Sequence, residues 1–569
     1  MKGFLFVISI LLSNTLCSQV SIDSVQMYNS IVFADVYGHV KYYYPIKNTS
    51  ALLWEDIVSV GLATVSECKN DDELKDSLES FFSKIAPEIV FTNSNIIIND
   101  TINLKKKKYY YEHEGFGQGK ISSSSKLLDF LITLTQPYKT KIKYRKPKTN
   151  IKFYRIEYEN ITTNIPYGVD KPFKIKNFNK QLEVEEIHHN IGAVIIAWNI
   201  YKHFYPYQRN IVEDWGVILK KAITIVSLEN TEYGTFKALN YLSYTLNDGH
   251  ARTFYRDDSL HYLPPFKVRI IDSSLVVSEV LLDFKDEISL GVEILMINKV
   301  PIKKLIDSLK YQVSSSTQQW RDFRIEDEIL KGTKNSNIKI TYRENYIVKE
   351  KTIIRNKTNS NWVYQGEGIK LIGDSIYYLD INELTYSDFK KNISKFNSSK
   401  GIIVDFRGYP KTVNILKHFK DTVLKSSYWK VPYKTLYTIN KDEYVSKGPA
   451  TRWTIKPSNK LITVPTVFIS DGSAISFAET CLDMIKYYNL GTIIGQSTAG
   501  SNGNVNGFWI YNKYYCIFTG MKVVKNDGEL ITKDGITPDI VVPVTKEGIK
   551  MSKDERLFYA IDYLKQLNK

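Results

Sequence analysis

A serine lies where a predicted strand turns into a predicted helix, a position suited to nucleophilic chemistry. Residues 464–469 are apolar and have the length of one buried strand, and residues 470–473 form a turn signal. Helical spacing of apolar residues follows, so Ser476 falls in the first turn of a helix, where unpaired N–H groups favour negative charge. There a hydroxyl can attack a carbonyl while amides hold the oxyanion. The alternative is that Ser476 only caps the start of the helix and has no chemical role.

The second candidate for chemistry is the tripeptide Asp248-Gly249-His250. Imidazole titrates near neutral pH, so histidine can act as a general base without special burial. Because Asp-Gly favours a tight turn, the next side chain can project into a cleft. A lone histidine is more commonly structural, so this assignment depends on how near His250 and Ser476 lie in the fold.

The elements that must position Ser476 belong to a region that starts near residue 365. Apolar runs between turn signals predict strands there, and helical spacing predicts helices. The predicted strands are 376–381, 401–406, 464–470 and 491–494, and the predicted helices are 386–396 and 475–488. This alternation is typical of an α/β layer fold.

Two further regions are predicted to be rich in strands. Residues 263–360 form a compact β unit with a short helix near 302–309 and a closing hairpin at 337–354. Residues 94–180 carry alternating stretches, for which we expect a β-rich accessory module.

Residues 19–90 and 180–255 resemble two copies of one helical unit. Four residues recur at a constant offset of 161, with chance among aromatic-rich segments as the alternative: Lys41, Tyr44, Pro45 and Trp54 recur as Lys202, Tyr205, Pro206 and Trp215. The copies diverge at their ends. The second closes with the tripeptide that contains His250, whereas the first has Pro87, Glu88 and Ile89 in those places.

Length and composition restrict the class of protein. The 569 residues are too many for one hydrophobic core, so several domains are expected. The net charge of +15 is spread along the chain, which favours a solvated basic surface over a nucleic-acid site. After removal of a signal, Cys68, Cys481 and Cys516 remain, an odd number without the spacing of a metal site.

The N-terminus reads as a secretory signal. Lys2 is followed by apolar residues 4–12 and by a polar exit at 13–18. The apolar run is short for a membrane span, and no other stretch is long enough for one. We therefore expect a secreted, periplasmic or outer-membrane-associated protein.

Five motifs together resemble peptidase family S41, which includes the tail-specific proteases and the tricorn core protease. They occur in the family's order and cover roughly residues 180–569: DGH at 248–250, IIVDFRGYP at 402–410, Ser476 with Glu479, GQSTAGSNGNVN at 495–506, and GITPD at 535–539. The resemblance implies an α/β fold with a ClpP/crotonase-like catalytic core. Residues 291–302 also resemble a strand of the PDZ-like domain that the family inserts before this core.

The sequence patterns and the resemblance together predict a division into five parts. These are a signal peptide at 1–18, an N-terminal accessory domain at 19–180, a helical part with the candidate base at 181–262, a PDZ-like domain at 263–360 and the catalytic core at 361–569.

The family pattern also implies roles for the candidate residues. The family's nucleophile stands three residues before a glutamate, which selects Ser476 over Ser473. Ser501 occupies the place of the general base in the lysine-using branch, so the histidine-using, tricorn-like branch is implied, with His250 as the base.

The oxyanion hole departs from the family pattern. The resemblance implies donation by the N–H of Phe477 and by a backbone N–H after the Asp-Phe-Arg motif. Here the usual Asn-Gly-Gly is replaced by residues 409–412, and Gly408 is the one glycine left. Because proline has no N–H, Gly408, Tyr409 or Lys411 must donate.

The remaining site residues follow from the same resemblance. The tricorn-like branch orients its histidine with a glutamate, but that position is Thr532, with Glu529 or Asp534 as substitutes. Small and polar residues are expected to line the substrate cleft beside the nucleophile: Thr498, Ala499, Gly500 and Asn502.

We therefore expect a serine endopeptidase that acts on polypeptides outside the cytoplasm, with the PDZ-like unit holding the substrate's C-terminus. No metal, cofactor or nucleic acid is implied. A non-catalytic peptide-binding scaffold is the alternative, supported by the altered oxyanion loop and by Thr532. An esterase with the same constellation is a further alternative.

Overall fold

The computed structural model describes most of the chain from residue 22 to residue 568. The undescribed segments within this span are 48–50, 95–105, 115–138, 147, 149–150, 159, 175–183, 257–258, 363–366, 374, 437–440, 442, 445–451 and 532–533. The predicted signal at 1–18 lies outside the described residues. Among the helices that are described, none combines the length and apolar character needed to cross a bilayer.

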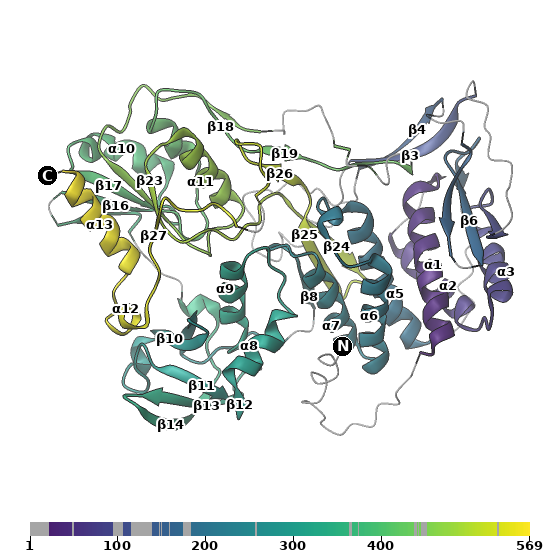
Figure 1. Cartoon of the computed structure of the whole chain (residues 1–569), viewed down its shortest axis with the longest axis horizontal. Coiled ribbons are helices and arrows are strands. Elements are labelled where there is room, and N and C mark those ends of the chain that lie inside the picture. Colours follow the sequence, from purple (N-terminus) through teal and green to yellow (C-terminus); the bar gives the residue numbers. More distant parts are fainter. Residues whose placement is uncertain are drawn as a thin grey trace.

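A six-stranded sheet forms the C-terminal part of the molecule (Figure 1). Its order is β15 (Ile369–Ile372), β16 (Ile376–Asp380), β17 (Gly401–Asp405), β22 (Thr466–Ser470), β23 (Thr492–Gly495) and β27 (Ile540–Val541). All neighbours from β16 to β27 are parallel, and β15 is antiparallel to β16. The carboxyl ends of the parallel strands meet at one edge, where sites of such sheets form.

Helices cover both faces of this sheet. Successive residues of β17 alternate between two cores, so Ile402 packs with α10 (Tyr386–Asn397) and α11 (Phe477–Tyr488), and Ile403 packs with α13 (Glu555–Leu567). This burial of both faces explains why the strands read as continuous apolar runs. The predicted mixed α/β fold is confirmed.

A second six-stranded sheet comes from residues 266–354 (Figure 1). It consists of β9 (Phe266–Ile271), β10 (Ser274–Val280), β11 (Glu293–Ile297), β12 (Val300–Pro301), β13 (Asn337–Glu344) and β14 (Ile347–Ile354). Strand β9 lies at one edge, and α9 (Gln318–Glu328) packs beside it. Helix α8 (Ile302–Lys310) packs nearby, and the predicted hairpin is β13–β14.

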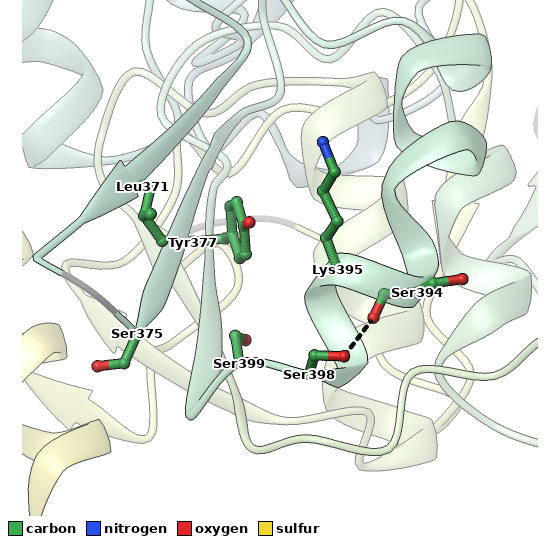
Figure 2. A pocket seen from close by; sticks show the side chains of 7 residues that line it. All are labelled: Leu371, Ser375, Tyr377, Ser394, Lys395, Ser398 and Ser399. Carbon is green, nitrogen blue, oxygen red and sulfur yellow. Dashed lines mark hydrogen bonds between the residues drawn. The ribbon is translucent and has the colours of Figure 1, made fainter.

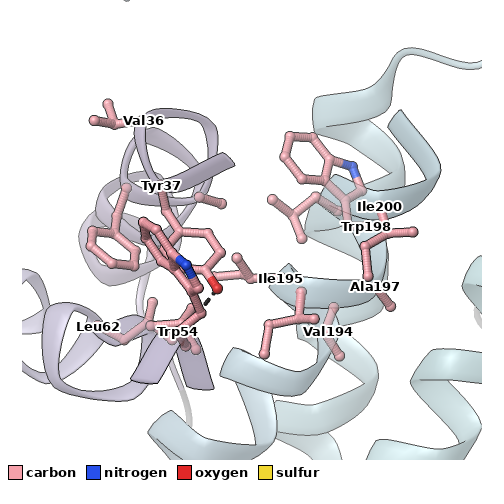
Figure 3. Packing of buried hydrophobic residues seen from close by; sticks show 14 of the residues in the cluster. Val36, Tyr37, Trp54, Leu62, Val194, Ile195, Ala197, Trp198 and Ile200 are labelled. Atoms are coloured by element: carbon pink, nitrogen blue, oxygen red, sulfur yellow. Dashed lines mark hydrogen bonds between the residues drawn. The ribbon is translucent and has the colours of Figure 1, made fainter. Parts of the chain in front are cut away.

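Two helical units with the same order of elements precede the sheet of residues 266–354 in the chain. The first consists of α1 (Ser24–Tyr43), α2 (Ala51–Ser66), α3 (Asp71–Phe82) and β2 (Val90–Asn93), and the second of α5 (Glu186–Phe204), α6 (Trp215–Leu228), α7 (Glu232–Thr245) and β8 (Arg252–Tyr255). Each element of the second unit lies close to 161 positions after its counterpart. The two units share one hydrophobic core, in which α2 packs against α5 (Figure 3).

Equivalent residues make equivalent contacts in the two units. The Tyr37 hydroxyl donates to the Trp54 carbonyl at 3.1 Å, and the Trp198 indole N–H donates to the Trp215 carbonyl at 2.7 Å. Both donors and both acceptors are related by the same sequence offset. Figure 3 shows Tyr37 and Trp198 on facing helices of this core.

The duplication extends to a small antiparallel sheet beside each helical unit. In the first unit β2 pairs with β6 (Ile161–Pro166), which pairs with β5 (Phe153–Glu157). In the second unit β8 pairs with β25 (Tyr514–Thr519), which pairs with β24 (Val505–Ile510). Part of the β-rich segment 94–180 therefore corresponds to a hairpin that the second unit takes from the C-terminal region.

A strand-rich arm links the C-terminal part to the N-terminal unit (Figure 1). It contains β18 (Leu424–Lys425), β19 (Tyr428–Lys430), β20 (Tyr433–Lys434) and β21 (Thr454–Ile455). Strand β19 pairs with β26 (Lys522–Val524), and β20 pairs with β3 (Lys108–Glu114), which in turn pairs with β4 (Lys139–Arg145).

Candidate active site

Ser476 sits at the strand-to-helix turn in a strained backbone conformation. It lies between β22 and α11 with φ 58° and ψ −107°. A residue with a Cβ rarely adopts positive φ, and such strain persists where surrounding contacts enforce it. The Ser476 N–H is held by the Ser501 carbonyl at 3.0 Å and by Glu479 Oε2 at 3.1 Å. These contacts fix a turn that presents the hydroxyl at the carboxyl edge of the sheet.

Glu479 is the buried anchor of this turn. Its carboxyl group is fully buried, and burial raises its pKa to about 7 although hydrogen bonds oppose the rise. In addition to the Ser476 N–H, it accepts the Thr498 hydroxyl at 2.6 Å, the Gly500 N–H at 2.7 Å and the Ser501 N–H at 3.0 Å. The glutamate therefore ties the 498–501 loop to the start of α11 and has a structural role.

His250 ends a hydrogen-bonded chain that begins at Asp248. The Thr519 hydroxyl lies 2.7 Å from Asp248 Oδ1, and His250 Nδ1 lies 2.7 Å from the same hydroxyl oxygen. The Thr519 N–H also donates to Asp248 Oδ2 at 2.6 Å, so β25 and the loop after α7 are joined at this point. All three residues are buried.

The order of donors in this chain selects one tautomer of His250. A carboxylate only accepts, so the single Thr519 proton points to Asp248 and the Thr519 oxygen accepts from His250. His250 Nδ1 therefore carries a proton, and Nε2 keeps its lone pair. Burial lowers the pKa of His250, with Asp248 opposing and Arg252 adding to the shift. The ring is thus neutral near pH 7 and able to accept a proton through Nε2.

Ser501 joins the histidine loop to the nucleophile turn. Its carbonyl accepts the Ser476 N–H, and its hydroxyl accepts the Gly249 N–H at 2.6 Å. Ser476 and the neighbour of His250 are therefore bonded to the same residue, although they lie over two hundred positions apart. In the described chain no hydrogen bond joins the Ser476 hydroxyl directly to the imidazole.

Helix α9 and the segment leading into it contact both sides of this arrangement. The Ser314 hydroxyl accepts the Asp248 N–H, and the Trp320 indole N–H donates to the Gly249 carbonyl, each at 3.0 Å. On the other side, Thr317 donates to the Ala499 carbonyl at 2.8 Å and Gln319 donates to the Thr498 carbonyl at 2.7 Å. The unit at 266–354 therefore supports the histidine loop and the 498–501 loop together.

The predicted oxyanion loop is held by Asn382. Its side-chain N–H donates to the Arg407 carbonyl at 2.8 Å, and its Oδ1 accepts the Tyr409 N–H at 2.7 Å. Tyr409 was predicted as a backbone donor, and this is wrong for the conformation seen because its N–H is already bonded. Gly408 has φ 101°, and its N–H and that of Phe477 have no acceptor among the described residues.

The predicted cleft residues are buried. Thr498, Ala499, Gly500 and Asn502 are covered by α9, by Glu479 and by neighbouring residues. The prediction that they line an open cleft is therefore corrected. They form the support beneath the nucleophile turn, because their polar groups face protein partners.

One of the predicted partners of His250, Glu529, is also corrected. Thr519 holds the imidazole, whereas Glu529 pairs with Lys525 at 3.0 Å and its side chain is exposed. Thr532 lies outside the described residues. Sequence reasoning missed Thr519 because it lies 269 positions from His250 and no short motif joins them.

A separate surface cavity of about 330 Å³ lies at the other end of the sheet (Figure 2). Its lining includes Ser375 at the start of β16 and Ser399 just before β17. These are the amino ends of parallel strands, opposite the edge that carries Ser476. The cavity therefore does not belong to the candidate site.

Comparisons with known proteins agree with this geometry. Residues 375–542 match the model of peptidase family S41, and curated proteins give no match. Mature CPAF complexed with lactacystin has a similar structure, with TM-score 0.55 and 14% identity over 67% of this chain and 98% of that chain. A crystal structure of mature CPAF gives TM-score 0.52 and 13% identity over 67% and 96% of the two chains. At these identities the likeness to CPAF shows a shared fold. The match to peptidase family S41 covers residues 375–542, which include the parallel strands β16 to β27 and Ser476.

Proposed function

We propose that this protein is a serine peptidase in which Ser476 is the nucleophile and His250 the general base. The observations that carry the proposal are the Asp248–Thr519–His250 chain, which leaves Nε2 with its lone pair, and the contacts of Ser501 with both Gly249 and Ser476. A histidine with a fixed tautomer, a strained serine and free N–H groups at a helix start are the parts that acyl transfer requires.

The reaction follows from these positions. His250 Nε2 takes the Ser476 proton while the serine oxygen bonds to the scissile carbonyl carbon, and the carbonyl electron pair moves to its oxygen. In this proposal that oxyanion is bound by the N–H groups of Phe477 and Gly408, which have no acceptor among the described residues. Collapse breaks the C–N bond, and the imidazolium returns the proton to the leaving amine. Water then clears the acyl-enzyme by the same steps.

A polypeptide substrate fits the unit at 266–354, which we assign as PDZ-like. Its edge strand β9 offers a place for strand addition. A cavity of about 240 Å³ lies between β9, α9 and the turn before Ser476, and its lining includes Arg269, Glu326 and Asp471. The Ile270 N–H at this edge is bonded to Glu326 at 2.7 Å, so an incoming strand would displace that carboxyl group.

We place the action of the protein outside the cytoplasm, in the periplasm or beyond. The support is the pattern of Lys2, apolar residues 4–12 and the polar exit at 13–18.

The second candidate function is a peptide-binding scaffold without catalysis. Two observations favour it. The Tyr409 N–H is bonded to Asn382. Among the described residues, no hydrogen bond joins the Ser476 hydroxyl to His250. Both weaken the oxyanion hole or the proton transfer, and neither affects strand addition at β9.

Labelling with a fluorophosphonate probe separates these functions. We expect the folded wild-type protein to be labelled, labelling to vanish in Ser476→Ala, and labelling to fall steeply in His250→Ala. Ser473→Ala is the matched control on the same turn, because the Ser473 hydroxyl is bonded to Asp471 at 2.5 Å. Absence of labelling in the wild type would favour the scaffold. Turnover of peptides against simple esters then distinguishes a peptidase from an esterase.

A further inference from the structure

The loop after β17 supplies few backbone donors to an oxyanion. Pro410 has no N–H, the Tyr409 N–H is bonded to Asn382, and the Lys411 N–H is bonded to the Ile381 carbonyl at 3.1 Å. Within residues 408–411 of the described chain, Gly408 therefore has the one N–H that is not bonded to an acceptor. A loop with so few free N–H groups needs another donor if it is to stabilise developing charge well.

The side chain of Tyr409 lies at this place. Its ring packs against Phe477, the first residue of α11, with ring centroids 5.8 Å apart and planes tilted by 54°. Because its backbone is anchored to Asn382, the ring reaches from the loop toward the nucleophile turn. The residue is 58% exposed, so the ring stands at the solvent side of the site and not in the core.

The Ser476 side chain is also a polar neighbour of the phenol. Burial raises the pKa of Tyr409, and the interaction with the Ser476 side chain opposes that rise. The phenol is therefore protonated near neutral pH and can donate. A donor beside the serine oxygen is also close to the oxygen of any carbonyl that the serine attacks, because those two oxygens share one carbon in the tetrahedral intermediate.

We propose that the phenolic O–H of Tyr409 is a donor of the oxyanion hole and replaces the N–H groups that this loop lacks. The inference rests on the proposed peptidase function. As the Ser476 oxygen bonds to the carbonyl carbon, the carbonyl π pair moves to oxygen and His250 Nε2 takes the serine proton. The phenol then turns from the serine oxygen to the new oxyanion without giving up its own proton. When the C–N bond breaks, the pair returns to the carbonyl and the phenol is released.

The substitution Tyr409→Phe tests this role, because it keeps the ring contact with Phe477 and removes only the hydroxyl. Loss of one oxyanion donor should lower kcat on the order of 10²-fold. KM should stay within about twofold, since the oxyanion exists only in the transition state and intermediate. A peptide aldehyde, which forms a tetrahedral adduct with the serine, should lose affinity by a similar factor.

The matched control is Tyr487→Phe. Tyr487 lies near the end of α11, the helix that begins with Phe477, and its side chain is 54% exposed. It should change neither kcat nor aldehyde affinity. An unchanged kcat in Tyr409→Phe would overturn the proposal, and a raised kcat would show that the phenol blocks the serine instead. Failure of the wild type to react with a fluorophosphonate would overturn the peptidase function and the phenol's role together, whereas labelling with an unchanged Tyr409→Phe overturns only the latter.

Discussion

The two helical units of this chain share a scaffold but differ where chemistry is placed. After the third helix, the second unit has Asp248 and His250, and the first unit has Pro87 and Ile89. In each unit these residues lead into the edge strand of the small sheet, which is β2 in the first unit and β8 in the second. The helices, the buried hydrogen bond of each unit and the sheet order are retained without the ionisable residues. The fold of this unit therefore does not require the polar groups that we assign to catalysis.

Thr519, the residue that joins Asp248 to His250, also differs between the two units. Thr253 pairs with Cys516 in one sheet and Thr92 pairs with Thr162 in the other. By this register, Thr519 of the second unit corresponds to Ile165 of the first, which is fully buried. The hydrogen-bonded chain Asp248–Thr519–His250 of the second unit is therefore replaced by apolar packing in the first unit.

The largest expected effect is at His250. Replacing it with the residue of the first unit, His250→Ile, should lower kcat by roughly 10⁴-fold or more because no base remains. The matched Ile89→Ala should leave kcat unchanged and lower the free energy of unfolding by about 2–5 kcal/mol. Steady-state kinetics and denaturant unfolding measure the two effects. Because burial lowers the pKa of His250 below its ordinary 6.5, wild-type kcat/KM should fall only as pH drops below that value.

Activity of His250→Ile within tenfold of wild type would refute the assigned base. A fall in kcat/KM that is centred at or above pH 6.5 would contradict the assignment of a buried, neutral imidazole.

A smaller effect is expected at Thr519. Thr519→Val removes the hydroxyl between Asp248 and His250 and leaves a buried donor and acceptor unpaired. Leaving these buried groups unpaired costs about 1–3 kcal/mol. If that cost is added to the activation barrier, kcat falls by roughly 10- to 100-fold. Thr519→Ser should restore most of the rate. The counterpart Ile165→Val should cost about 0.5–1.5 kcal/mol of stability with kcat unchanged. Equal kcat in Thr519→Val and wild type would show that the hydroxyl does not orient the ring.

The smallest of the three effects is expected at Gly249. An added Cβ there would lie 2.7 Å from the Ser501 hydroxyl and 2.8 Å from the Trp320 indole nitrogen. Gly249→Ala should therefore cost about 1–3 kcal/mol of stability, and it should lower kcat by roughly tenfold as Ser501 shifts. The exposed counterpart Glu88→Ala should change stability by no more than about 0.5 kcal/mol. If Gly249→Ala changed neither stability nor kcat, the contact of Ser501 with the histidine loop would not be needed for activity.

Local sequence patterns predicted the α/β layer and the turn that bears Ser476, because strand and helix periodicity act over short distances. They did not predict that Thr519 holds His250, since β25 meets the histidine loop only through tertiary pairing. They also placed Thr498, Ala499, Gly500 and Asn502 in the substrate cleft, because the sequence does not show that α9 of a separate unit covers this loop. The commitment of the Tyr409 N–H to Asn382, 27 positions away, has the same cause.

The packing of α2 on α5 has a practical consequence for expressing the protease half alone. Gly192 of α5 lies so close to Val58 and Ser59 of α2 that an added Cβ would meet them at 3.1 and 3.4 Å. A recombinant fragment starting at residue 181 would uncover this face and leave β20 without its partner β3. Each large apolar side chain newly exposed to water costs about 1.5–3 kcal/mol, and a bare strand edge invites self-association. We expect such a truncated fragment to accumulate as insoluble material.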